Sequence, residues 1–235
     1  MRKKQKLWLD LATNLAVIFL AMSVGIVCFL PTESKAVASS SELVRSGCSE
    51  NGVSLMFNVY WGTDEVYQIL DVLDEYSAKS TFFIGGCWAD DNVDCLKEIV
   101  SRGHEIGNHG YFHKDQDKLS EEQNREEILR CNQFISLSVG VQPTLFAPPS
   151  GAYCEATLSA AKRLDMKTVL WSNDTIDWRD KDPSTVYQRA TKNVKAGALV
   201  LMHPMPHTVK ALPDILKEYK RRGLAAITVG ENLGE

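Results

Sequence analysis

The chain has 235 residues, of which 44% are hydrophobic and 24% are charged, a composition that suits one globular domain with a sizeable core. Residues 1–38 carry five of the 26 Lys and Arg but only two of the 30 Asp and Glu, so residues 39–235 hold 21 basic and 28 acidic side chains and a formal net charge of −7. An acidic domain is a poor candidate for binding nucleic acid, because that affinity rests on phosphate contacts. It would also be repelled by anionic polymers unless its groove is locally neutral or basic.

Residues 1–38 have the pattern of a targeting segment. A basic start precedes the apolar run of residues 11–30, and a small-residue A-x-A site follows at Ala36 and Ala38. This order predicts a secretory signal peptide. The run is also long enough to span a bilayer, so an uncleaved membrane anchor is the alternative. Either way, we expect an extracytoplasmic domain, secreted or cell-wall associated or membrane-anchored, that meets the membrane only through this segment.

The next stretch, residues 39–52, is polar and rich in Ser, and is predicted to be a linker. The domain proper is then residues 53–235. Seven strand-like runs follow in this part of the chain, at residues 53–58, 79–85, 104–109, 144–148, 166–171, 198–202 and 225–229.

Helical patterns alternate with these strands. We expect Thr63 to cap the first helix and Ser120 with Gln123 to form a capping box. Another helix should start at Asp182–Pro183, and the last should run from near Pro213 to Gly223.

Strands alternating with helices predict a parallel sheet with right-handed crossovers. Seven such units in this length predict a small distorted (β/α)7 barrel, with an open doubly wound sheet as the alternative. The first strand is not followed by G-x-G-x-x-G, so a dinucleotide-binding role has no support.

Five cysteines lie beyond the leader, with spacings that match no zinc ribbon: Cys48, Cys87, Cys95, Cys131 and Cys154. An oxidising compartment allows one or two disulfides, with one thiol left over. We prefer a Cys87–Cys95 pair, because the two residues flank one short helical turn.

Barrels of this kind build their sites from loops at the carboxyl ends of the strands. Polar residues follow several of the predicted strands there, namely Asn58, His109 and His113, Asp174 and Asp177, and His203. Each has a structural alternative: the histidine pair could be two surface residues, Asp177 a turn cap and His203 a core residue bonded to backbone. The set is more specific than any of its members.

Over residues 53–230 the sequence resembles the polysaccharide deacetylases (carbohydrate esterase family four, the NodB homology domain). "STFFIGGCWADDNVDCLKEIVSRGHEIGNHGYFH" is similar to the family's second strand through its histidine motif, and "LFAPPSGAY", "IDW" and "LMH" match the next three motifs in order. "FNVYWG" looks most like the sporulation-associated branch.

The resemblance implies hydrolysis of N-acetyl groups by metal-activated water, with a divalent metal, usually zinc, as cofactor. His109 and His113 match the metal histidines. His203 matches the general acid, and Asp177 the carboxylate that orients it. The implied substrate and oxyanion residues are Pro149, Gly151, Tyr153, Trp178 and Leu201.

Three positions depart from the family pattern. Asn58 occupies the position of the general base, Val59 that of the aspartate metal ligand, and Ala147 that of the arginine that braces the base. An amide cannot act as a general base, and the loss of such a group costs typically about 10²–10⁴-fold in rate. Valine cannot ligate a metal, which leaves two imidazoles.

Two functions therefore stay open, both with an N-acetylated glycan as partner. The first is an extracytoplasmic deacetylase of peptidoglycan or a chitin-like glycan, which would need a substitute base and a third metal ligand, with Asp64, Glu65, Asp115 and Asp174 as candidates by position. The second is a catalytically inactive glycan-binding pseudoenzyme that uses aromatic side chains, namely Tyr60, Trp61 and Trp178. A thiol hydrolase using Cys154 is a weaker third hypothesis, because no motif places a base beside it.

Overall fold

The computed structural model describes residues 43–235, so the predicted leader and the first part of the predicted linker lie outside the described residues. The described strands are β1 (Leu43–Val44), β2 (Gly52–Val59), β3 (Thr81–Ile84), β4 (Glu105–Asn108), β5 (Leu145–Phe146), β6 (Lys167–Val169), β7 (Asn173–Asp174), β8 (Leu199–Met202) and β9 (Ala225–Ala226).

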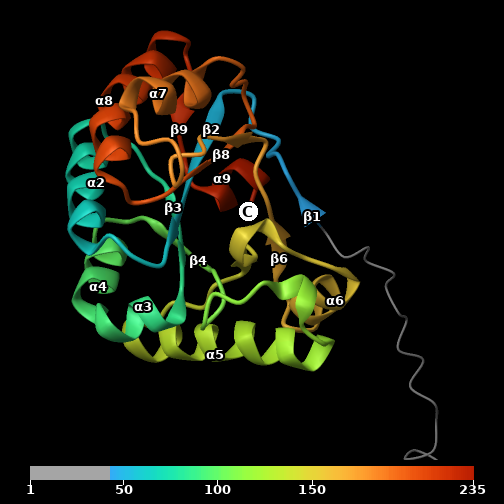
Figure 1. The fold of residues 1–235 in the computed structure, drawn as a ribbon. Helices are drawn as coiled ribbons and strands as arrows, with labels where there is room; N and C mark the ends of the chain where they lie inside the picture. Colours follow the sequence, from blue (N-terminus) through green and yellow to red (C-terminus); the bar gives the residue numbers. More distant parts are fainter. Residues whose placement is uncertain (1–42) are drawn as a thin grey trace, which may run out of the picture. The chain divides into compact units, whose positions relative to one another are not determined.

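All the strand pairs are parallel, in the order β1-β6-β5-β4-β3-β2-β8-β7, and β9 pairs with the first residues of β2. The sheet curls into a half-barrel (Figure 1), which confirms the predicted distorted (β/α)7 barrel. β2 is central and buried along its whole length. Its side chains alternate between the faces: Phe57 and Val59 belong to the apolar cluster shared with the helices, and Met56 packs with Phe83 and Leu199 in a second cluster.

Most helices pack on the outside of the sheet (Figure 1). The α-helices are α2 (Thr63–Glu75), α3 (Gly86–Asp91), α4 (Val93–Ser101), α5 (Glu121–Val139), α6 (Glu155–Arg163), α7 (Pro183–Thr191), α8 (Pro206–Arg221) and α9 (Val229–Leu233), with short 3₁₀ turns η1 (Gln116–Lys118) and η2 (Pro149–Gly151). Helix α7 packs against α8, α8 against α2, α2 against α4, and α5 against α3, α4 and α6, whereas α9 packs against β2. The capping box at Ser120 and the Asp182 cap of α7 are both confirmed.

Several local predictions were wrong. The N-cap of α2 is Gly62 rather than Thr63. The last long helix starts at Pro206 and runs through Pro213, because buried residues of its first turns, among them His207 and Thr208, hold it in place before the proline. Within the stretch predicted as a linker, residues 43–44 form β1 and pair with β6.

The preferred Cys87–Cys95 disulfide is also wrong, because both residues are free thiols in the structure. Cys95 is buried in the apolar cluster between the sheet and the helices, where desolvation raises its pKa to about 11. The other described cysteines, Cys48, Cys131 and Cys154, are free as well.

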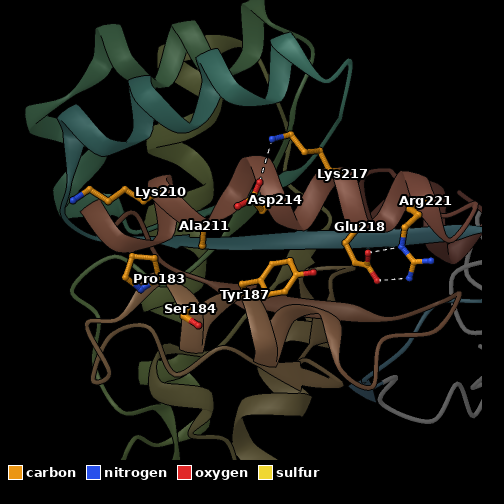
Figure 2. A pocket seen from close by; sticks show the side chains of 9 residues that line it. All are labelled: Pro183, Ser184, Tyr187, Lys210, Ala211, Asp214, Lys217, Glu218 and Arg221. Atoms are coloured by element: carbon orange, nitrogen blue, oxygen red, sulfur yellow. Dashed lines mark hydrogen bonds and ion pairs between the residues drawn. The ribbon is translucent and has the colours of Figure 1, made fainter.

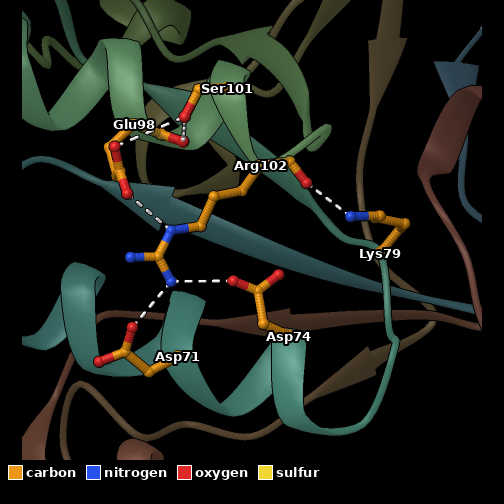
Figure 3. Close-up of polar contacts among 6 residues, drawn as sticks. All are labelled: Asp71, Asp74, Lys79, Glu98, Ser101 and Arg102. Atoms are coloured by element: carbon orange, nitrogen blue, oxygen red, sulfur yellow. Dashed lines mark hydrogen bonds and ion pairs between the residues drawn. The ribbon is translucent and has the colours of Figure 1, made fainter.

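Arg102, at the end of α4, joins this helix to α2 (Figure 3). Its guanidinium contacts Asp71 at 2.7 Å, Asp74 at 2.9 Å and Glu98 at 2.9 Å. Lys79 donates to the Arg102 carbonyl at 2.5 Å and ties the start of β3 to the same corner. One cation shared by three carboxylates thus fixes the packing of two neighbouring helices.

Within residues 43–235, no helix combines the length and the apolar character needed to cross a membrane.

Candidate functional site

A cavity of about 420 Å³ opens where the strands end. Asn58 reaches it from β2, His109 from the end of β4, Asp174 from β7 and His203 from the end of β8. The full lining is Asn58, Trp61, His109, His113, Ser150, Trp171, Asp174, Trp178, Leu201 and His203. The structure therefore brings together histidines and aromatic residues that the sequence places up to 142 positions apart, from Trp61 to His203.

The predicted oxyanion segment borders this cavity without lining it at every position. Ser150 lines it, whereas Pro149, Gly151 and Tyr153 do not. The Tyr153 hydroxyl instead accepts a hydrogen bond from Arg45 at 3.3 Å. Gly151 has φ of +65°, and a Cβ there would lie 2.7 Å from the Trp171 ring, so only glycine fits beneath this wall of the cavity.

His203 and Asp177, which match the family's general acid and the carboxylate that orients it (together called the acid arm), are in direct contact. The buried carboxylate of Asp177 accepts hydrogen bonds from the His203 ring Nδ1, the His203 backbone N–H and the Thr208 hydroxyl, each 2.7 Å long. Because a carboxylate only accepts, Nδ1 carries the proton and Nε2 of His203 is free on the other side of the ring. Burial opposes ionisation of Asp177, but the hydrogen bonds from His203 and Thr208 outweigh it and hold the pKa of this carboxyl below its usual range.

The histidine pair is arranged as in a ligand set. His109 Nδ1 lies 2.7 Å from the Ala147 carbonyl, to which it donates, so the His109 Nε2 keeps its lone pair. Its ring centroid is 5.1 Å from that of His113. Burial, reinforced by the neighbouring His113, lowers the pKa of His109 to about 3, and burial also lowers the pKa of His113. Both rings are therefore neutral at physiological pH, the form that binds metals.

The position of the family's third metal ligand, an aspartate, holds Val59. Val59 is fully buried in the apolar cluster with Phe57 and Val66 and does not line the cavity. Across residues 43–235, no cluster of three His, Cys, Asp or Glu side chains is placed to hold a metal ion. Catalytic zinc sites use three protein ligands, so the donor set here does not fit one.

The positions of the family's general base and of the arginine that braces it hold neutral residues, Asn58 and Ala147. Asn58 is 4% exposed, and its Oδ1 has no hydrogen-bond partner within the part of the chain that the structure describes. Ala147 is buried in the second apolar cluster, with Met56 and Phe83, and its side chain offers no polar group; its backbone carbonyl bonds His109. The cavity thus ends in an unpaired amide oxygen instead of a braced carboxylate.

Of the four acids considered as substitute bases, Asp174 lines the cavity. Asp64 and Glu65 lie in the first turn of α2, and Asp115 bonds Lys118 at 2.5 Å, so none of these three reaches it. Burial raises the pKa of Asp174. Its Oδ1 accepts the Ile176 N–H at 2.8 Å, which keeps the side chain oriented.

Cys154 caps α6 and lies outside the cavity lining. Its backbone N–H donates to the Thr157 hydroxyl at 3.1 Å, and its thiol lies 3.6 Å from the same oxygen. A hydroxyl is no general base, so the thiol-hydrolase hypothesis gains nothing from the structure.

Several functional neighbours escaped the sequence analysis. Thr208 has no motif, and its role follows only from the contact with Asp177. Glu127 of α5 is buried, accepts the Phe112 N–H at 2.8 Å and pairs with Lys114 at 3.1 Å. Glu127 therefore bonds the residues on both sides of His113 and holds this segment in place. The φ of His113 is +54°, which is strained for a non-glycine residue.

A second hollow, of about 530 Å³, lies between α7 and α8 (Figure 2). It is larger but contains none of the predicted site residues. Four of its five charged side chains pair with each other: Asp214 bonds Lys217 at 3.1 Å and Glu218 bonds Arg221 at 2.7 Å. The cavity at the strand ends is the better candidate, because the predicted site residues Asn58, His109, His113 and His203 all line it.

Comparison with known proteins agrees with this geometry. The polysaccharide deacetylase family profile matches residues 46–169. A peptidoglycan-N-acetylglucosamine deacetylase of Bacillus cereus is 37% identical over 180 residues, which cover 73% of this chain and 84% of that protein. The peptidoglycan-N-acetylmuramic acid deacetylase PdaA of Bacillus subtilis is 30% identical over 179 residues, 74% of this chain and 68% of the relative. The chain belongs to the polysaccharide deacetylase family.

Three further similarities are to an uncharacterised protein, to a pseudoenzyme of the family and to a mutant of that pseudoenzyme. YlxY of Bacillus subtilis, an uncharacterised protein, is 38% identical over 183 residues, 78% of this chain but only 57% of YlxY. The crystal structure of BA3943, a CE4 family pseudoenzyme of Bacillus anthracis, superimposes with a TM-score of 0.80 at 33% identity, over 83% of this chain and 69% of that one. A mutant of BA3943 with restored enzymatic activity matches equally well, with a TM-score of 0.80 at 31% identity, over 83% of this chain and 72% of that one.

Proposed function

We propose that this protein binds N-acetylated cell-wall glycan in the cavity at the strand ends and does not hydrolyse it. The observation that carries the proposal is the burial of Val59 in the apolar cluster beneath the sheet, next to an Asn58 that lines the cavity. Restoring the ligand set would require a side chain to leave that cluster. Two imidazoles and an amide oxygen are a weaker set than the three ligands of catalytic zinc.

Asn58 cannot act as a general base, but its unpaired oxygen favours binding of a ligand. A buried acceptor without a partner costs about 1–3 kcal/mol, and a ligand that brings an N–H into the cavity recovers this loss. The acetamido group of an N-acetylhexosamine carries such an N–H. At the position of the general base, Asn58 cannot take up a proton. Its side-chain oxygen can instead accept a hydrogen bond from the amide N–H of the sugar.

The retained acid arm does not require turnover. Asp177 bonds the backbone of His203 and the side chain of Thr208, and the His207 ring contacts the Asp177 carbonyl at 2.6 Å. These contacts fix the entry into α8, so loss of Asp177 would disturb the fold as well as the acid. In a binder, the free Nε2 of His203 is a hydrogen-bonding group for the sugar.

The test combines two measurements on the purified protein. Acetate release from N-acetylated glycan is followed with and without zinc, beside His203→Ala, and glycan binding is followed by calorimetry in chelator. We expect binding that survives the chelator and no acetate above background. Zinc-dependent release that His203→Ala abolishes would overturn the proposal.

One observation favours a second candidate, a hydrolase with a relocated base. Asp174 lines the cavity, and burial raises its pKa in the direction that a general base needs. In this case acetate release would be abolished by Asp174→Asn while glycan binding persisted. The same assay therefore separates the two candidates.

We further propose an extracytoplasmic location, supported by the basic start, apolar run and A-x-A site of residues 1–38. Protease digestion of intact cells tests it, because only an outward-facing domain is cleaved.

A further inference from the structure

We propose that the cavity selects a neutral N-acetylhexosamine over a sugar that bears a carboxylate, with Trp61 as the stacking platform and Asp174 as the discriminating charge. This inference rests on the proposed glycan-binding function and deepens it by naming the class of sugar. The choice is a real one within the family, because its members include deacetylases of N-acetylglucosamine and of N-acetylmuramic acid.

Trp61 is held in place by two neighbours, and part of the residue stays exposed. Its indole stacks on the His203 imidazole with ring centroids 5.8 Å apart and planes 6° from parallel. Its Nε1 lies 3.2 Å from the Met205 sulfur, which fixes the ring within that plane. The residue is still 40% exposed and lines the cavity, so part of its ring surface is open to a ligand. A flat, preorganised aromatic face suits the apolar face of a pyranose ring.

Trp178 forms a second exposed aromatic surface at the same mouth. It is 52% exposed and lines the cavity, as Trp61 does. Large aromatic side chains left exposed around a cavity usually mark a ligand-binding surface. Together with the buried Asn58 oxygen, they give the cavity apolar walls and a few polar anchors, the usual composition of a small-ligand site.

The charge of the cavity is set by Asp174. Neither lysine nor arginine is among the lining residues. Arg179 and Arg189, whose charges act on Asp174 from outside the lining, both bond the carboxylate of Asp180, at 2.9 and 2.6 Å. Asp177 is likewise occupied by His203. Asp174 is therefore left facing the cavity without an ion-pair partner of its own among the described residues, and it can accept hydroxyl groups of a neutral sugar.

A carboxylate on the sugar would meet this charge at short range. A cavity of about 420 Å³ is about 9 Å across if it is spherical, close to the ~8 Å screening length at physiological salt. Any anionic substituent inside it is thus only partly screened from Asp174. We expect a preference of about tenfold for the neutral sugar, about 1.4 kcal/mol, which is the scale of one charge pair near a protein surface.

The test uses calorimetric titration at pH 7.5 with two tetrasaccharides of equal length, one of N-acetylglucosamine alone and one alternating N-acetylglucosamine with N-acetylmuramic acid. The wild type should bind the neutral tetrasaccharide about tenfold more tightly. Asp174→Asn should narrow that gap to about twofold or less by strengthening binding of the carboxylated glycan. Asp94→Asn is the matched control, because Asp94 is an exposed acid on α4 outside the cavity, and it should leave the ratio unchanged. Trp61→Leu should weaken both glycans about tenfold or more.

The outcomes separate the two proposals. Equal affinities, a preference for the carboxylated glycan, or a ratio that Asp174→Asn does not change would overturn this inference and leave glycan binding intact. If the Trp61→Leu variant binds both glycans as tightly as the wild type, Trp61 is not the stacking platform and that part of the inference is wrong. Absence of binding to either glycan would overturn the proposed function, and this inference with it.

Discussion

Asn58 and Val59 are neighbours in β2, yet their side chains lie on opposite faces of the sheet: Asn58 lines the cavity and Val59 packs in the apolar cluster with Phe57. The alternation of side chains along a strand accounts for this arrangement. The two substitutions therefore have different consequences. Asn58 changes the chemistry of the cavity, whereas Val59 contributes to the stability of the core.

The position of Val59 predicts a large cost for restoring an acid there. Val59→Asp places a carboxylate among apolar side chains and should lower the free energy of unfolding by more than about 4 kcal/mol, beyond the usual range for single substitutions. Val59→Ala, the size control, should cost roughly 1–3 kcal/mol. Urea denaturation measures both. A Val59→Asp variant as stable as the wild type would show that the introduced carboxylate can reach the cavity.

Asn58 should show a trade-off between stability and binding. Asn58→Leu removes the unpaired buried oxygen and should raise the free energy of unfolding by about 1 kcal/mol or more. The same change should weaken binding of N-acetylated glycan about tenfold, because the ligand N–H loses its acceptor. Chemical denaturation and calorimetry on one sample measure both effects. A variant that loses stability would contradict the assignment of an unsatisfied oxygen.

Thr208→Val tests the support of the acid arm, since it keeps the shape of the side chain and removes the hydroxyl that bonds Asp177. We expect a loss of about 1–3 kcal/mol at neutral pH. A depressed carboxyl pKa stabilises the fold above the unfolded value of about 3.9, and this stability is lost as pH falls through the folded pKa. With less depression, the acid unfolding of the variant should begin at a higher pH. Superimposable acid transitions would rule out this role.

His104 predicts a second acid sensitivity, far from the cavity lining. It is 6% exposed, both of its ring nitrogens lack partners among the described residues, and it packs edge-on against Phe82. Burial, aided by Lys79, lowers its pKa to about 4, so between about pH 6.5 and 4 the unfolded chain binds the extra proton and stability falls with pH. The total loss is roughly 3 kcal/mol.

His104→Leu should remove this dependence, and the free energy of unfolding should change less between pH 7 and 5 than in the wild type. Equal slopes for the two proteins over that interval would mean that His104 is not protonated on unfolding.

The sequence was sufficient for the barrel, because long apolar strands such as β2 and capped helices such as α5 carry clear periodic signals. It was also sufficient to place His109 and His203 at the cavity, because each directly follows a strand, together with His113 four residues after His109. It was insufficient for β1 and β7, since a strand of two residues has no period. Trp171 and Ser150 reach the cavity only through tertiary packing, and α8 was truncated because Pro213 looked like a helix start.

The most direct test of the central claim is a single titration of the purified protein with N-acetylglucosamine tetrasaccharide in chelator, followed by measurement of free acetate after zinc is added to the same sample in molar excess over the chelator. The account predicts saturable binding in chelator and no acetate above the protein-free background after zinc. Binding that appears only with zinc, accompanied by acetate release, would contradict it and identify the protein as an active deacetylase.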